Sequence, residues 1–105
     1  MVVRVWHGWT RAEDAEEYEQ LLIGSILPGI AARNISGYQG SELFRRAGPT
    51  EVEFKTVLWF ESRDAAREFG GEDDTRAAIP PAAKALLLRF REEARHYEVR
   101  KPREG

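Results

Sequence analysis

The sequence predicts one α+β domain, residues 1–105, whose elements follow the order strand, helix, strand, strand, helix, strand. This prediction rests on three observations. Segments rich in β-branched and aromatic residues alternate with segments whose apolar residues recur every three or four positions. Clusters of Gly, Pro, Asn and Ser separate these segments, as turns do. The length of 105 residues is that of one domain, and no internal repeat or linker divides the chain.

The first predicted strand covers residues 2–9, where Val and Trp dominate. A helix is expected to follow from Thr10, because Thr10 and Glu13 form the Thr-x-x-Glu pattern of a capping box. Pro28-Gly29 is expected to kink or end this helix, with a further turn up to Arg33. The residues on its predicted apolar face are Ala15, Tyr18, Leu22 and Ile26.

Two further strands are predicted over residues 38–46 and 51–61, joined by a hairpin loop at 47–50. Apolar residues alternate along one face of the second of these strands, at Val52, Phe54, Leu58 and Phe60. Val57 and Trp59 make its opposite face apolar as well. A sheet with two apolar faces needs two covers. We expect the helices to supply one and the sheet of a second copy of the chain to supply the other.

The second half of the chain predicts two short helices and a last strand. Ser62 is expected to cap the first helix, which ends at Gly70-Gly71. After an acidic turn, Pro80-Pro81 is expected to open another helix. The buried side of that helix is expected to carry Leu86, Leu87 and Phe90. Residues 95–100 form the last predicted strand. Two split βαβ units of this kind predict a ferredoxin-like fold, an antiparallel sheet with helices on one face.

Composition excludes several classes of function. The net charge of −2, with both signs mixed along the chain, is not the basic footprint of a nucleic-acid-binding protein or a membrane-surface protein. Cysteine is absent, which removes disulfides, thiolate catalysis and zinc–thiolate sites. We expect a cytoplasmic protein, because a chain without cysteine suits a reducing compartment and no signal peptide is visible. The longest apolar stretch is too short and too interrupted to span a membrane.

Short motifs recur in a fixed order over nearly the whole chain. They are Arg4-Val5-Trp6-His7-Gly8, Gly37-Tyr38-x-Gly40, Leu43-Phe44-Arg45-Arg46, Glu61-Ser62 with Phe69-Gly70-Gly71-Glu72-Asp73, and His96-Tyr97-Glu98-Val99. Together they resemble the antibiotic biosynthesis monooxygenase (ABM) superfamily of dimeric α+β barrels, and especially its small uncharacterised bacterial members. The resemblance implies a homodimer whose two sheets pack into a barrel, with a pocket between sheet and helices in each subunit.

The resemblance also implies several possible activities. Members of this superfamily oxidise aromatic polyketides with O2 and no added cofactor, oxidise quinols, or bind and degrade haem, and the fold alone does not choose among these. Two positions depart from the family pattern. Phe60 stands where the family often has Trp, and Trp59 lies one residue earlier on the opposite face. The position of the haem-ligating His of the haem-degrading branch falls near Ile79, and isoleucine cannot ligate iron.

His96 is the candidate catalytic residue. Its imidazole can accept a proton near neutral pH, which a cofactor-free oxygenase needs in order to generate an electron-rich substrate anion. The alternative is a strand-end histidine that serves structure or dimer packing. His7, beside Gly8, is interpreted as a partly exposed strand residue. We predict no metal site, because two distant histidines without cysteine lack the spacing of metal ligands, and we predict no cofactor.

Trp6, Phe60, Arg4 and Tyr18 are the predicted substrate-pocket residues. Trp6 and Phe60 belong to an aromatic set on neighbouring strands that suits a planar aromatic molecule, although core packing is the commoner role of such residues. Arg4 could stabilise a developing oxyanion. The alternative, which we favour, is an ion pair between Arg4 and Glu53 across two strands. The Tyr18 hydroxyl could orient a substrate, or the ring could serve only the apolar face of its helix.

The sequence therefore predicts a homodimer, associated through its sheet faces, with cofactor-independent monooxygenase activity on an aromatic or quinol-like small molecule. The alternative is a non-catalytic dimeric module that binds a small hydrophobic ligand in the same pocket. A third hypothesis is haem binding. No nucleic-acid or membrane partner is expected.

Overall fold

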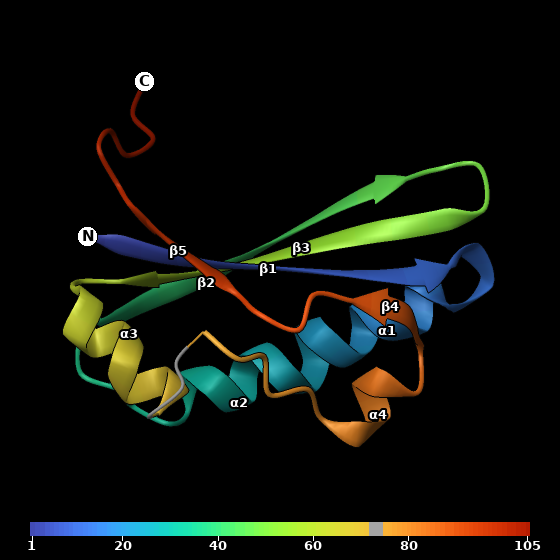
Figure 1. Cartoon of the computed structure of the whole chain (residues 1–105), viewed down its shortest axis with the longest axis horizontal. Helices are drawn as coiled ribbons and strands as arrows, with labels where there is room; N and C mark the ends of the chain where they lie inside the picture. Colours follow the sequence, from blue (N-terminus) through green and yellow to red (C-terminus); the bar gives the residue numbers. More distant parts are fainter. Residues whose placement is uncertain (72–74) are drawn as a thin grey trace.

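An antiparallel sheet of five strands forms one layer of the protein, and the helices lie on one side of it (Figure 1). The computed structural model describes residues 1–71 and 75–105. The acidic turn expected after the short helix, with the Glu72-Asp73 part of its motif, lies outside the described residues. The strands are β1 Val2–Arg11, β2 Tyr38–Ala47, β3 Glu51–Phe60, β4 Leu87–Phe90 and β5 Arg95–Glu98. They are arranged in the order β2-β3-β1-β4, and β5 pairs with β1 beside β4. The ferredoxin-like α+β class is therefore confirmed.

The helical layer comes from two parts of the chain. Its helices are α1 Ala15–Leu21, α2 Leu27–Ala31, α3 Arg63–Gly70 and α4 Pro81–Lys84. A 3₁₀ turn, Ala12–Asp14, precedes α1, and a π-helical turn, Leu22–Ile26, joins α1 to α2. No helix among residues 1–71 and 75–105 is both long enough and apolar enough to cross a membrane.

Strand β1 is longer than predicted, and the capping box at Thr10 is wrong. Thr10 pairs with Val52 on one side and with Leu87 on the other, so the ladder holds it inside the sheet. Its side chain is completely buried, and its hydroxyl donates to the carbonyl of Arg11. The helical backbone begins only at Ala12, after Arg11, without a side-chain cap. Pairing on both sides of β1 therefore overrides the local signal for a helix start.

Helical backbone runs past Pro28 into the further turn that the sequence predicted, and an irregular π-helical turn directly precedes this part. Pro28 has no N–H to donate, and the helix accommodates it directly after the π-helical turn Leu22–Ile26. The carbonyl of Pro28 accepts from the Ala32 amide, so the helix continues beyond the proline to Ala31. The longer helical segment provides one wall of the site described below.

The predicted helix over Leu86, Leu87 and Phe90 is wrong. Helix α4 ends at Lys84 after a single turn, and Leu87–Phe90 form strand β4 on the free edge of β1. Apolar residues that lie three or four positions apart fit a short helix and a short bulged strand equally well. The outcome follows from the unpaired N–H and C=O groups that β1 offers along that edge.

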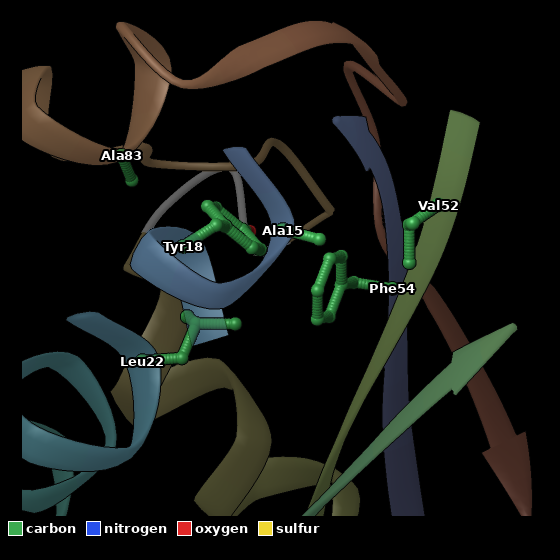
Figure 2. Close-up of a cluster of buried hydrophobic side chains, with 6 residues drawn as sticks. All are labelled: Ala15, Tyr18, Leu22, Val52, Phe54 and Ala83. Carbon is green, nitrogen blue, oxygen red and sulfur yellow. The ribbon is translucent and has the colours of Figure 1, made fainter. Parts of the chain in front are cut away.

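Side chains along the two central strands, β1 and β3, point alternately to an inner face, which the helices cover, and to an outer face. On β1 the residues at even positions from Val2 to Thr10 point to the inner face and are buried. Strand β3 contributes Val52, Phe54, Leu58 and Phe60 to the same face, as predicted. Phe54 and Val52 meet residues of α1 and α4 in a core cluster (Figure 2). The second core cluster consists of Leu58, Phe60, Ala65 and Ala66 beneath α3.

The ends of α3 are set as the sequence predicted. The Ser62 hydroxyl accepts a hydrogen bond from the Ala65 amide at 3.2 Å, which caps the helix. Gly71 has a φ of 77° and its amide donates to the carbonyl of Arg67, which ends the helix in the left-handed region that glycine tolerates. These caps fix the position of Phe69, which borders the site.

Candidate functional site

A cavity of about 90 Å³ lies between the inner face of the sheet and the helices. Arg4 and Trp6 on β1, with Thr56 and Leu58 on β3, form its floor. The helical segments α1 and α2 and residues 77–80 form its walls and cover. An apolar cavity of about 150 Å³ admits benzene. The inner cavity is therefore smaller than a site that holds benzene, and well below the 300–1,000 Å³ typical of ligand pockets.

The Trp6 ring is held in one orientation in this cavity. Its indole nitrogen donates to the carbonyl of Arg91 at 2.7 Å, and its ring centroid lies 6.3 Å from that of Phe90. The residue is 9% exposed. An aromatic wall with its polar atom already satisfied offers a ligand an apolar surface and no competing donor.

Tyr18 reaches the same cavity from α1, and it belongs to the core cluster shown in Figure 2. Its ring meets Phe54 edge to face, with centroids 4.8 Å apart, and the residue is 1% exposed. Burial raises the pKa of the Tyr18 hydroxyl to about 12. Tyr18 is therefore a neutral phenol at physiological pH, able to donate a hydrogen bond to a ligand and unable to act as a base.

Arg4 points into the inner face, and the predicted ion pair between Arg4 and Glu53 is wrong. The register of β1 and β3 places Arg4 opposite Leu58 and Glu53 opposite Trp9, so the two side chains lie on opposite faces of the sheet. Glu53 instead accepts from His7 Nδ1 at 2.8 Å on the outer face. Arg4 is 8% exposed and donates to the carbonyl of Arg76 at 3.3 Å.

The two remaining predicted site residues do not line the cavity. His96 on β5 is the register partner of Arg4, which places it on the inner face at the sheet edge. Phe60 is completely buried and packs in the second core cluster, with its ring 5.7 Å from Tyr38 and 5.8 Å from Phe69. The structure therefore brings Trp6, Tyr18 and Arg4 together at the cavity, while His96 lies opposite Arg4 on the neighbouring strand β5 and Phe60 lies in the core.

Sequence reasoning missed Thr56, although a signal for it exists. Thr56 occupies the one polar position in the alternation of Phe54 and Leu58 along the buried face of β3. The residue lines the cavity, and its hydroxyl oxygen is buried and has no hydrogen-bond partner within residues 1–71 and 75–105. A buried hydroxyl without a partner is unfavourable. Thr56 therefore marks a place where a polar atom of a ligand would gain a hydrogen bond.

The cavity does not fit haem. Haem iron is held by His, Cys, Met or Tyr side chains. Tyr18 is the only residue of these types among the described lining residues, and its raised pKa keeps it protonated. Ile79 lines the cavity where the resemblance placed an iron-ligating histidine. In the part of the chain that the structure describes, no group of three His, Asp or Glu side chains gathers to hold a metal ion.

Known structures resemble this fold over nearly its whole length. An antibiotic biosynthesis monooxygenase-type protein from Bacillus cereus matches with a TM-score of 0.70 at 10% identity, covering 99% of this chain and 95% of the other. The haem degrader MhuD from Mycobacterium tuberculosis, with two haems in its active site, matches with a TM-score of 0.64 at 19% identity, covering 99% and 100%. SnoaB, a cofactor-independent oxygenase from Streptomyces nogalater, matches with a TM-score of 0.55 at 16% identity, covering 96% and 95%.

The chain thus has the ABM-type fold that the sequence motifs suggested. No protein-family model and no curated protein matches the sequence. At these identities the likeness establishes the fold, and the activity has to be argued from the residues of the cavity.

Proposed function

We propose that this protein is an ABM-like homodimer that binds a small aromatic or quinol-like molecule in the inner cavity and oxidises it with O2 without a cofactor. The observation that carries the proposal is the polarity of the cavity. Its mostly apolar wall holds a fixed indole from Trp6, and three polar residues, Arg4, Tyr18 and Thr56, are part of its lining. Such a lining grips a planar ring and orients its oxygen atoms.

The chemistry needs a substrate that can supply electrons to O2 itself. Loss of a proton from an anthrone gives an electron-rich anion that reduces O2. The ring CH2 then loses two hydrogens and gains one oxygen as C=O, and the second oxygen leaves as water. A quinol in the same site gives a quinone and hydrogen peroxide. The guanidinium of Arg4 would stabilise the anion in either case, at a buried position where such stabilisation is strong.

We assign the proton acceptor to His96 as part of this proposal. Neither a carboxylate nor an imidazole is present among the described residues that line the cavity, and Tyr18 is a neutral phenol. His96 is the nearest candidate by topology, because it is the cross-strand partner of Arg4. A base outside the lining can act through one bridging water.

Oxygen uptake by the purified protein with a panel of anthrones and quinols tests the assignment. We expect turnover by the wild type and a loss of about 10²–10⁴-fold in His96→Ala, the usual contribution of a general base. His7→Ala is the matched control, because His7 pairs with Glu53 on the opposite face, and its rate should stay close to wild type. Equal rates for His96→Ala and wild type would refute the role of His96.

The second candidate function is a non-catalytic module that binds a small hydrophobic ligand. It is favoured by the same absence of a base from the described lining. Native mass spectrometry of the protein as purified separates the two functions. A ligand retained unchanged under O2, with no uptake across the panel, would support the binding module and count against the oxygenase.

Dimerisation through the outer face of the sheet is also part of the proposal. All four helices lie on the inner side, so no described helix covers the outer face (Figure 1). Val3, Val5, Val57 and Trp59 are the apolar residues at its centre. Two polar pairs on this face are already formed, since the Trp59 indole donates to Glu42 and His7 contacts Glu53. A second sheet would therefore bury these four groups as satisfied pairs. The cytoplasmic location expected from the sequence stays a prediction.

Sedimentation of wild type and Val5→Glu tests this interface. We expect a dimer at micromolar concentration for the wild type and a monomer for Val5→Glu, because a charge would be buried in the apolar centre of the interface. Ile23→Glu is the control, since Ile23 is 53% exposed on the helical side and should leave the dimer intact. A wild type that stays monomeric at this concentration would contradict the proposed interface.

A further inference from the structure

A second and larger hollow adjoins the inner cavity. This outer cleft has a volume of about 440 Å³ and lies between α2, the end of α3 and residues 76–82. It shares with the inner cavity the residues Arg4, Ile26, Ile30, Phe69, Ala78 and Pro80. The two hollows are therefore parts of one site, with Arg4 and Phe69 at the junction. Their combined size reaches the range of ordinary ligand pockets, which the inner cavity alone does not.

The outer cleft is lined by three arginines and by no described carboxylate. Arg33 and Arg76 make no ion pair with any residue in the part of the chain that the structure describes. The Arg33 guanidinium stacks on the Phe69 ring, 4.8 Å from its centroid, and donates to the carbonyl of Phe69 at 3.1 Å. A backbone carbonyl and an aromatic face orient a guanidinium without cancelling its charge. The cleft therefore presents oriented positive charge next to an apolar cavity.

The polar hydroxyl of Thr56 lies at the other end of this site. Thr56 lies in the floor of the inner cavity, while Arg33 and Arg76 line the outer cleft and not the inner cavity. The site thus has the hydroxyl residues Thr56 and Tyr18 and the apolar wall of Trp6 at its inner end, Arg4 at the junction, and Arg33 and Arg76 at a cationic mouth. A ligand that matches it needs a ring, a polar atom on the inner side and an anionic group on the outer side.

The geometry points to a ligand that is a hydroxylated aromatic acid. Its ring lies against Trp6 and extends from the inner cavity through the junction, its hydroxyl meets Thr56, and its anionic group lies in the outer cleft between Arg33 and Arg76. This inference rests on the proposed function for the location of the site, and it names the substrate class. It does not depend on turnover, because the arginines act on binding.

Calorimetric binding of hydroxynaphthoate and its neutral amide, hydroxynaphthamide, tests the inference on the full chain. We expect the acid to bind at least about tenfold more tightly than the amide, as a charge-assisted pair with a guanidinium provides. In the double variant Arg33→Gln, Arg76→Gln the preference for the acid should fall severalfold, to what Arg4 alone provides, while amide binding stays unchanged. Added salt should weaken binding of the acid and leave binding of the amide unchanged.

Two further variants complete the experiment. Arg100→Gln removes an arginine that lines neither hollow, and it should keep the full preference for the acid. Thr56→Val should abolish the preference for hydroxynaphthoate over naphthoate. Thermal melting of each variant establishes that it is folded before binding is measured.

The outcomes distinguish this inference from the proposed function. Preference for the acid without any oxygen uptake would support the inference and count against the oxygenase. Oxygen uptake with equal binding of acid and amide would overturn the inference and leave the oxygenase standing. Failure of the wild type to bind either compound would overturn the inference as well.

Discussion

Phe54→Ala should lower the free energy of unfolding by about 3–5 kcal/mol, the largest effect expected of any single substitution considered for this protein. Phe54 is completely buried at the centre of the first core cluster, and it meets Tyr18 edge to face at 4.8 Å. Removing the ring leaves a cavity between β3 and α1 that the neighbouring side chains cannot fill. Domains are stable by only about 5–15 kcal/mol, so the loss is a large part of the total. Urea unfolding measures it.

A matched substitution on the other side of the same helical layer provides the control. Ile23→Ala also removes a large apolar side chain, but Ile23 is 53% exposed and packs in neither core cluster. Its free energy of unfolding should change by less than about 1 kcal/mol, as is usual for surface positions. Similar losses in Phe54→Ala and Ile23→Ala would contradict the position of the core beneath α1.

Local signals were enough to predict most of the fold. Strand β3 could be predicted because its alternation of apolar residues needs no knowledge of a partner, and α3 because Ser62 and Gly71 specify its ends. Strand β4 could not be predicted in this way. The spacing of Leu87 and Phe90 fits a helix and a strand alike, and the free edge of β1, which decides between them, lies far away in the sequence. Thr10 was mispredicted for the same reason.

Which residues reach the site depends on the pairing register of β1 and β3, and this register cannot be read from the sequence. Arg4 was paired with Glu53 because both are charged and lie on neighbouring strands. The antiparallel register opposes Arg4 to Leu58, which turns the guanidinium toward the helices and the cavity. Thr56 could not be assigned to the site for a similar reason. A polar residue at a buried strand position indicates a ligand site only once the cavity that it lines is known. The pairing of Arg33 with Arg76 in one cleft could not be predicted, since segments far apart in the chain bring the two residues together.

Gly8→Val should lower the free energy of unfolding by about 1–3 kcal/mol and displace the Trp6 ring from the site. A Cβ at Gly8 would lie 2.9 Å from Leu87 Cδ2 and 3.0 Å from Trp6 Cη2. The indole therefore lies across the bare backbone of Gly8, and the absence of a side chain there allows the ring to line the cavity. Valine would push the ring away and weaken its hydrogen bond to Arg91. Urea unfolding gives the stability, and calorimetry with hydroxynaphthoate reports the shape of the cavity.

Gly24→Val separates this steric effect from the general cost of replacing glycine. A Cβ at Gly24 meets no atom within 4 Å, and valine is a better helix former than glycine, so stability should change by less than about 0.5 kcal/mol. Binding of hydroxynaphthoate should match the wild type in Gly24→Val and weaken in Gly8→Val. If Gly8→Val instead binds and unfolds as the wild type does, the Trp6 ring does not depend on Gly8, and the aromatic wall of the cavity must be formed differently. The site would then lose the feature that fixes the plane of a bound ring, and oxygenation of a planar substrate would have no structural basis in this cavity.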